Sequence, residues 1–444
     1  MNEKHHAMTK APVGPLILRL SIPNTLGLLV VSAYSLADSF FVSDLGGDAS
    51  AAVGLTFSLH VLMQAVGYTL GMGAGTLLSH AMGRGEEKSA FAYATVATIL
   101  SVLIGALITL TGLLFRAPLL RFLGASESLL PTALSYVTPL LWSAPAMCTA
   151  FVLSQLLRAK GRAVASMVGL MTGSLLNIAL DPVLISLFGL GIKGASLATL
   201  ISQSVGCGVL LLAFRKKRGE ASLFSGIKLR ELRRVGSILV AGLPSLFRQG
   251  LSGVATVLLN RTAAELGGDD AVSAISLVAR LFLLLFSVCL GIGQGMLPVV
   301  GYNAGAGNPD RMHRAYAFSM KAATLAMLLL SIPILIYAPQ VLTLLGCADQ
   351  GLSLGVRALR AQSLVLAAHG VITSTILYLQ ATKKSVWGTV LAAARQGIFF
   401  VPLLLLLPFH WGREGLVLIQ PIADLCTLLL SIPLARYAFR ATKG

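Results

Sequence analysis

The sequence predicts an all-α membrane protein with about 12 transmembrane helices, arranged as two pseudo-symmetric six-helix bundles that form a parallel repeat. Three observations support this fold class: the composition, the long apolar runs and an internal repeat. Of 444 residues, 56% are hydrophobic and only 11% are charged, whereas a soluble domain carries about 25% charged residues. The apolar runs have the length of membrane-spanning helices, about 20 residues, and they lack the alternating pattern of a β-barrel.

Turn residues and charges divide the chain into twelve expected spans. A cytoplasmic N-terminus over 1–14 precedes an N-lobe over 15–214, and a basic linker over 215–234 leads to a C-lobe over 235–438 and a tail over 439–444. No cleaved signal peptide is expected, because the first residues contain no short apolar region before a cleavage site. The spans are expected near residues 15–43, 49–81, 88–114, 127–156, 163–188, 194–214, 235–261, 271–303, 314–337, 352–380, 386–408 and 414–438.

The basic residues predict how the chain is oriented in the membrane. The net charge is +17, and about 24 of the 34 lysines and arginines fall in the ends, the linker and the connections on one side of the expected spans. Lysine and arginine accumulate on the cytoplasmic side of membrane proteins. We therefore expect a multi-pass protein of the cytoplasmic membrane with both termini in the cytoplasm. Its positive charge faces anionic lipid, and nucleic-acid binding is not expected.

A repeat of about 221 residues connects the two halves of the chain. "DLGGDA" at 44–49 matches "ELGGDD" at 265–270, and "GMGAG" at 71–75 matches "GIGQG" at 291–295. Six spans per half place both halves on the same starting side, so the repeats are parallel and related by an axis along the membrane normal. Two such bundles are typical of a transporter that opens alternately to the two sides of the membrane.

Two aspartates lie in apolar surroundings in the N-lobe. Asp38 occurs in "SLADSFF" and Asp181 in "NIALDPVLI". Ionisable residues inside a membrane cost at least ~2.5–3.5 kcal/mol each and are functional by default. Asn177 precedes Asp181 by one helical turn, so the two share a face, and Pro182 removes a backbone donor beside the acid. Burial and a second nearby carboxylate favour the protonated form of a carboxyl. These groups therefore predict a site for H⁺ or Na⁺; the alternative for Asp38 is a cap at the outer interface.

The chain resembles the multidrug and toxic compound extrusion (MATE) transporters along its whole length. The resemblance is carried by stretches such as "IPNTLGLLVVSAYSLADSFFVSDLGG" and "LLNIALDPVLI", and by "AGLPSLFRQG" and "GYNAGAG", which are most similar to the branch typified by the staphylococcal multidrug exporter. It implies a twelve-helix antiporter that exports cationic amphiphilic compounds in exchange for H⁺ or Na⁺. It also implies that Asp38, Asn177 and Asp181 are the N-lobe coupling residues.

The C-lobe lacks the acids that some members of this family carry in the seventh and tenth helices. Instead, four charged residues are expected near the middle of the membrane as a buried network, in which Asp424 pairs with Arg280 or Arg395. The alternative is that an unpaired arginine contacts an anionic group on the substrate. The four residues are Arg248, Arg280, Arg395 and Asp424.

Further polar and methionine side chains are candidates for the substrate cavity, because methionine gives an adaptable apolar lining. We expect cationic drugs or dyes and membrane lipids as partners, a monomer, and no cofactor beyond the coupling ion. The five cysteines are scattered and predict no disulfide framework. The candidate cavity residues are Tyr34, Met63, Gln64, Gln155, Met171, Gln249 and Met296.

Two other function classes compete with an exporter. A lipid-linked precursor flippase of the same superfamily would use midplane arginines to bind a pyrophosphate. An intramembrane aspartyl enzyme would use the two buried aspartates, but the sequence contains no GxGD, HExxH or GxSxG segment, and it contains no Walker A segment for ATP-driven transport. The sequence therefore favours an ion-coupled transporter over an enzyme.

Overall fold

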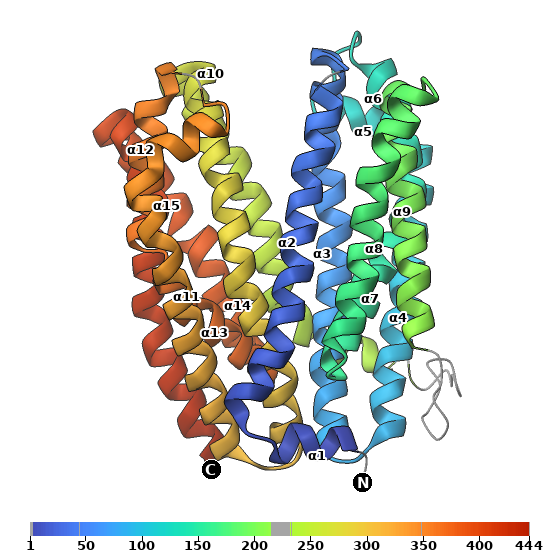
Figure 1. Cartoon of the computed structure of the whole chain (residues 1–444), viewed down its shortest axis with the longest axis vertical. Helices are drawn as coiled ribbons and strands as arrows, with labels where there is room; N and C mark the ends of the chain where they lie inside the picture. Colours follow the sequence, from blue (N-terminus) through green and yellow to red (C-terminus); the bar gives the residue numbers. More distant parts are fainter. Residues whose placement is uncertain (1–2, 44, 215–230, 232, 348, 444) are drawn as a thin grey trace. The chain divides into compact units, whose positions relative to one another are not determined.

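The computed structural model describes residues 3–43, 45–214, 231, 233–347 and 349–443 (Figure 1). The side chains of residues 3, 4, 34–43, 269, 349, 350 and 441–443 lie outside this description. Throughout the described ranges the regular elements are helical and no strand occurs. The all-α prediction is therefore confirmed.

The first half of the chain contains nine α-helices and one π-helical segment among its described residues. A short helix α1 precedes the first long helix, and the π-helical segment η1 follows α8 directly. The elements are α1 (Glu3–Lys10), α2 (Val13–Ser43), α3 (Gly47–Gly83), α4 (Glu87–Leu114), α5 (Arg116–Phe122), α6 (Leu130–Trp142), α7 (Ala144–Ala159), α8 (Ala163–Pro182), η1 (Val183–Leu187) and α9 (Gly191–Ala213).

The second half contains two long helices that are each interrupted by a glycine. Helix α10 breaks at Gly268 and α15 breaks at Gly412, where the backbone has φ values of 64° and 53° that glycine tolerates best. Each of these helices therefore contains a turn between two antiparallel runs. The elements are α10 (Arg234–Gly305), α11 (Pro309–Leu344), α12 (Asp349–Leu364), α13 (Ala368–Ala381), α14 (Ser385–Ala393), η3 (Ala394–Ile398) and α15 (Phe400–Lys443).

The number of membrane spans agrees with the prediction. Among the described residues, nine helical segments are long and apolar enough to cross a membrane, and two bent pairs raise this number to 11. The pairs are α6 with α7, bent by 47°, and α12 with α13, bent by 59°. One of the nine segments, Ser385–Arg440, contains the break at Gly412 and so holds two of the predicted spans.

The turns repeat their backbone conformation from one half of the chain to the other. Residues with positive φ recur at separations of about 221 or 222 residues, which is the shift of the sequence repeat. A left-handed residue marks a tight connection, so the same connections join corresponding helices in the two halves. The pairs are Gly46 and Gly268, Gly85 and Gly307, Gly124 and Gly346, Gly161 and Lys383, and Gly191 and Gly412.

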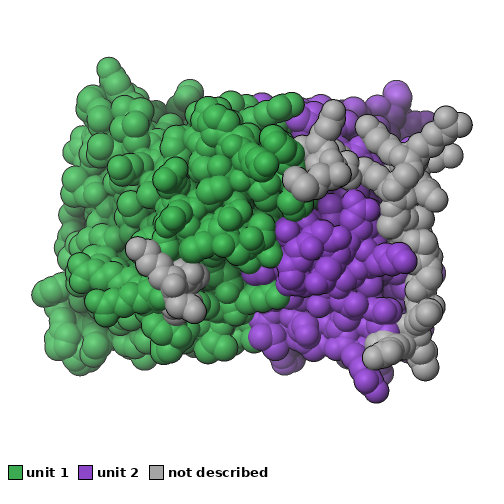
Figure 2. Space-filling view, turned by 90° about the horizontal axis from the view of Figure 1, so that it is seen from below, with its two compact units in different colours: residues 1–25, 243–444 green, residues 26–242 purple. Residues whose placement is uncertain are grey.

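The chain folds as two compact units, which Figure 2 distinguishes by colour. Unit 1 contains Met1–Thr25 and Leu243–Gly444, and unit 2 contains Leu26–Gly242. The core of unit 2 is formed mainly by α3, α4, α7 and α9, and one core of unit 1 by α10, α11, α12 and α15. The units differ from the predicted lobes at the beginnings of α2 and α10.

Close backbone contacts hold these two beginnings in their units. In unit 2, a side chain at Gly73 of α3 would clash with the carbonyl oxygen of Ile238, and one at Gly242 would clash with the carbonyl oxygen of Thr69. The start of α10 therefore packs directly against the backbone of α3, as only residues without a side chain permit.

The same arrangement occurs in unit 1 between α2 and the second run of α10. A side chain at Gly291 would clash with Thr25, and one at Gly295 would clash with Ser21. The hydroxyl of Ser21 also donates to the carbonyl oxygen of Ile292 at 3.3 Å. The glycine segments 71–75 and 291–295, which the sequence identified as a repeat, are thus places where helices approach closely.

Candidate functional site

Glycines in α8 and α9 bring two polar side chains of unit 2 together. An added Cβ at Gly206 of α9 would lie 3.2 Å from the carbonyl oxygen of Gly169 and 3.3 Å from the Cα of Gly173. Because the helices approach this closely, Asn177 of α8 reaches Thr199 of α9, and its Nδ2 lies 3.5 Å from the threonine hydroxyl. Asn177 is 1% exposed, and among the described residues its Oδ1 has no hydrogen-bond partner. This oxygen is available to a cation.

Asp181 lies one turn beyond Asn177 and is fully buried. It precedes Pro182, the last residue of α8, and the chain then continues as the π-helical segment η1. A proline removes one backbone hydrogen bond, and π-helical segments occur frequently at functional sites. The predicted pair of Asp181 and Asn177 lies on the same buried part of α8, directly before this π-helical segment.

Asp38 and Tyr34 belong to α2, but their side chains lie outside the described residues. Their predicted roles in ion coupling and in the substrate cavity stay predictions.

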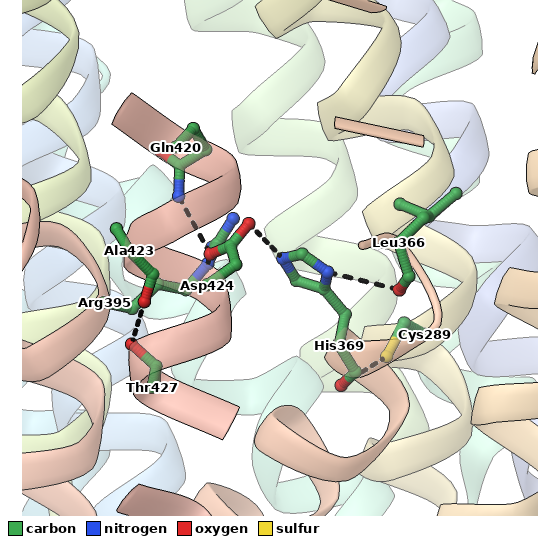
Figure 3. A network of polar contacts seen from close by, with 8 residues as sticks. All are labelled: Cys289, Leu366, His369, Arg395, Gln420, Ala423, Asp424 and Thr427. Atoms are coloured by element: carbon green, nitrogen blue, oxygen red, sulfur yellow. Dashed lines mark hydrogen bonds and ion pairs between the residues drawn. The ribbon is translucent and has the colours of Figure 1, made fainter. Parts of the chain in front are cut away.

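A second polar cluster lies inside unit 1, around Asp424 of α15 (Figure 3). One carboxylate oxygen, Oδ1, accepts hydrogen bonds from Arg395 Nε at 2.8 Å and from Gln420 Nε2 at 2.9 Å. The other oxygen, Oδ2, lies 3.3 Å from Nε2 of His369, at the start of α13. The side chains of Asp424 and His369 are fully buried, and that of Arg395 is 11% exposed.

Two aromatic rings of α10 complete this cluster. The guanidinium carbon of Arg395 lies 5.1 Å from the ring centroid of Phe282 and 5.4 Å from that of Phe286. The His369 ring packs against the same two phenylalanines, at centroid distances of 5.0 and 5.9 Å. Aromatic faces attract cations, so the two phenylalanine rings help to hold the guanidinium of Arg395 beside the carboxylate of Asp424.

The structure therefore selects one of the two predicted partners of Asp424. Arg395 forms the ion pair, whereas Arg280 is exposed and Arg248 is half-buried. The predicted network of four charges is thus wrong for Arg280. The reason is helical phase: Phe282 and Phe286 share the face of α10 that points to the cluster, and Arg280, two residues before Phe282, lies about 200° away from it around the helix.

The predicted cavity residues fall into two groups. Met63, Gln155 and Met296 are buried within the units. A Cβ added at Gly71 of α3 would lie 2.9 Å from the Cβ of Gln155, so Gln155 packs against α3. Gln64, Met171 and Gln249 are half-buried. A role of either group in lining a substrate cavity stays a prediction.

Sequence reasoning missed His369, Gln420 and Thr199. A histidine within the apolar segment "LVLAAHGVITSTIL" is an ionisable residue in a span, which is a functional signal by itself. Gln420 precedes Asp424 by one turn, so its contribution was also visible in the spacing. Thr199 gave no such signal, because threonines are frequent in these spans.

Comparisons with known proteins agree with the helical fold described above. The family model described as MatE matches residues 23–183 and 244–406. The chain is 28% identical over 432 residues to the FAD transporter of Shewanella oneidensis, covering 95% of this chain and 94% of that protein. It is 24% identical over 429 residues to the multidrug export protein MepA of Staphylococcus aureus strain MRSA252, covering 96% and 94%. A crystal structure of MATE in complex with MaL6 superposes with a TM-score of 0.92 at 27% identity and covers both chains completely.

Proposed function

This chain belongs to the MatE family of multi-pass membrane transporters, and on that premise we propose that it exports cationic amphiphilic compounds in exchange for H⁺ or Na⁺. The observation that carries the proposal is the fully buried carboxylate of Asp181, one turn from the Oδ1 of Asn177, which has no hydrogen-bond partner in the part of the chain that the structure describes. We further propose that the protein lies in the cytoplasmic membrane with both termini in the cytoplasm. The excess of basic residues on one side of the spans supports this orientation.

Helix geometry supports a site shared by Asp181 and Asp38. An added Cβ at Gly27 of α2 would lie 3.6 Å from the Cα of Met167 of α8, so these helices are in contact there. As the first and fifth spans, they run in the same direction. Eleven residues further along each helix, at about 1.5 Å per residue, residue 38 reaches the height of residue 178. The backbone of residue 38 therefore lies near the height of Asn177 and Asp181, and on that basis the proposed site includes all three residues.

Such a site explains exchange by competition. A proton or Na⁺ neutralises the carboxylates when the transported cation is absent, and the cation replaces it when present. In both states the negative charge of the carboxylates is therefore compensated by a positive charge, as the apolar interior requires, because an isolated charge is costly there. The ion is therefore released only when the substrate binds, and the substrate is released only when the ion binds.

A binding assay on the purified protein tests this proposal. The affinity for a fluorescent cationic dye should fall as the pH is lowered if H⁺ competes, or as Na⁺ is added at constant pH if Na⁺ competes. Asp181→Asn should flatten that dependence, whereas Asp48→Asn, which removes an exposed carboxylate at the start of α3, should leave it intact. A wild-type affinity that ignores both pH and Na⁺ would contradict a shared site.

An anionic substrate is the second candidate. It is favoured by the likeness to a protein named as an FAD transporter and by the exposed guanidinium of Arg280, since guanidinium groups bind phosphates with two hydrogen bonds. The same assay with FAD in place of the dye separates the candidates. Tight FAD binding that is lost in Arg280→Gln, without dye binding, would replace the first proposal by the second.

A further inference from the structure

Two aromatic side chains of unit 1 pair at one end of the last two spans. Trp387 lies near the start of α14 and Tyr437 near the end of α15, and their ring centroids are 5.7 Å apart in an edge-to-face arrangement. Gly412, where the chain turns, lies midway between them in the sequence, so the two antiparallel runs bring both rings to the same height. The rings are 43% and 46% exposed. Tryptophan and tyrosine accumulate at membrane–water interfaces, so this pair marks such a boundary.

The exposed face of the second run of α15 changes from apolar to basic at this height. Leu425, Leu429 and Ile432 are exposed within the span. Arg436 and Arg440 are exposed beside and beyond the aromatic pair. With 3.6 residues per turn, these five side chains fall within a sector of about 80° around the helix. One stripe of α15 therefore offers apolar contacts that are followed by two guanidinium groups.

The two arginines are available to an external anion. In the part of the chain that the structure describes, no ion pair or hydrogen bond joins the side chain of Arg436 or Arg440 to another residue. Lys384, in contrast, donates from Nζ to the carbonyl oxygen of Ala438 at 3.2 Å and lies 4.9 Å from the ring centroid of Tyr437. The lysine thus fixes the tyrosine ring, and the arginines are left to bind phosphate oxygens, which guanidinium groups contact with two parallel hydrogen bonds.

The first half of the chain does not repeat this surface. The turns before α8 and α14 correspond in the repeat, because both contain a residue with positive φ. At the same shift, Trp387 corresponds to Ala165, and Arg436 corresponds to the buried Phe214. The combination of an aromatic pair with exposed arginines is therefore a feature of the second half and not of the duplicated fold.

We propose that this surface binds a phospholipid with a net negative charge. The acyl chains lie along Leu425, Leu429 and Ile432, and the head-group phosphate is bound by Arg436 and Arg440 next to the aromatic pair. The apolar stripe favours a lipid over a soluble phosphate, which gains nothing from it. Two arginines also repel the ammonium group of a zwitterionic lipid. This site is separate from the one around Asp181, and the inference holds whatever compound the protein transports.

Tryptophan fluorescence tests the proposal without any transport assay. The chain contains three tryptophans, so Trp142→Phe combined with Trp411→Phe leaves Trp387 as the only reporter. The protein is reconstituted in phosphatidylcholine vesicles that contain a small fraction of either brominated phosphatidylglycerol or brominated phosphatidylcholine, because bromine quenches tryptophan on contact. Brominated phosphatidylglycerol should quench Trp387 more strongly at an equal mole fraction. Equal quenching by the two lipids would overturn the proposal.

Charge variants in the same reporter background locate the binding groups. Each arginine near the membrane surface is expected to contribute about fivefold to the preference for the anionic lipid, so Arg436→Gln combined with Arg440→Gln should abolish it. The matched control is Lys10→Gln combined with Lys88→Gln, which removes two exposed lysines at the ends of α1 and α4 and should keep the preference. A preference that persists in the arginine variant, or that is lost equally in the lysine variant, would contradict the assignment.

Inorganic phosphate distinguishes a lipid from a soluble anion as the occupant. Phosphate should reduce the quenching by brominated phosphatidylglycerol no more than chloride does at the same ionic strength, because both salts only screen the charges. Stronger competition by phosphate would assign the surface to a soluble anion and overturn the proposal of a lipid site.

Discussion

Replacing Asp424 with alanine tests the buried ion pair of unit 1. The change removes the acceptor of the 2.8 Å bond from Arg395 and of the 2.9 Å bond from Gln420, and it leaves a guanidinium that is 11% exposed without its carboxylate. Stranding one partner of a buried pair costs about 3–5 kcal/mol. Asp424→Ala should therefore lower the thermal stability in detergent strongly. An exposed pair of the same unit, Arg261 with Glu265, provides the control, because such pairs contribute about 0–1 kcal/mol.

A double-mutant cycle identifies the partner. Arg395→Met removes the charge that Asp424→Ala strands, so the double variant should be more stable than the sum of the two single losses predicts. The same cycle with Arg280→Met should be additive, because Arg280 is exposed on the other side of α10 and distant sites add. The assay is the apparent Tm of purified protein at one fixed pH. Additive losses with Arg395 would refute the pairing argument.

Three further changes test two backbone positions of the fold and the predicted coupling role of Asp38. Gly242→Val should destabilise the protein by about 1–3 kcal/mol through overpacking against Thr69. Gly208→Ala should not destabilise it, because a side chain at that position meets open space. Equal effects of the two changes in a thermal melt would contradict this packing. Lys383→Gly should raise stability by about 0.5–1 kcal/mol, because φ is 60° there and the counterpart in the first half is glycine; a lower Tm would argue against strain. Asp38→Asn should abolish drug resistance in cells at matched expression; full resistance would reduce Asp38 to an interfacial cap.

The architecture was predictable because it depends on properties that are local in sequence. Apolar length defines a span, basic residues mark its ends, and a duplicated turn such as "LGGD" repeats both its residues and its backbone conformation. The close helix contacts were visible only as a repeat of glycines. Their role in packing α2 and α10 depends on which helices meet, and composition carries no information on that.

The candidate site was predictable in part. The spacing of Asn177 and Asp181 puts them on one helical face, and both are buried. The partner of Asp424 was not predictable, because depth alone made Arg280 and Arg395 equivalent. The rotation of α10 and the π-helical segment that carries Arg395 decide between them, and both arise from packing. The bend between α12 and α13 brings His369 into contact with α15, a relation that sequence spacing does not contain.

Counter-flow in proteoliposomes is the most direct test of ion-coupled export through the Asp181 site. A pH gradient and a Na⁺ gradient are imposed separately on vesicles that contain the wild type, Asp181→Asn or Asp48→Asn, and uptake of a cationic dye is followed. The account predicts that one of the gradients drives accumulation in the wild type and in Asp48→Asn, and that neither does so in a folded Asp181→Asn variant. Gradient-driven accumulation that persists in Asp181→Asn at the wild-type rate would contradict it.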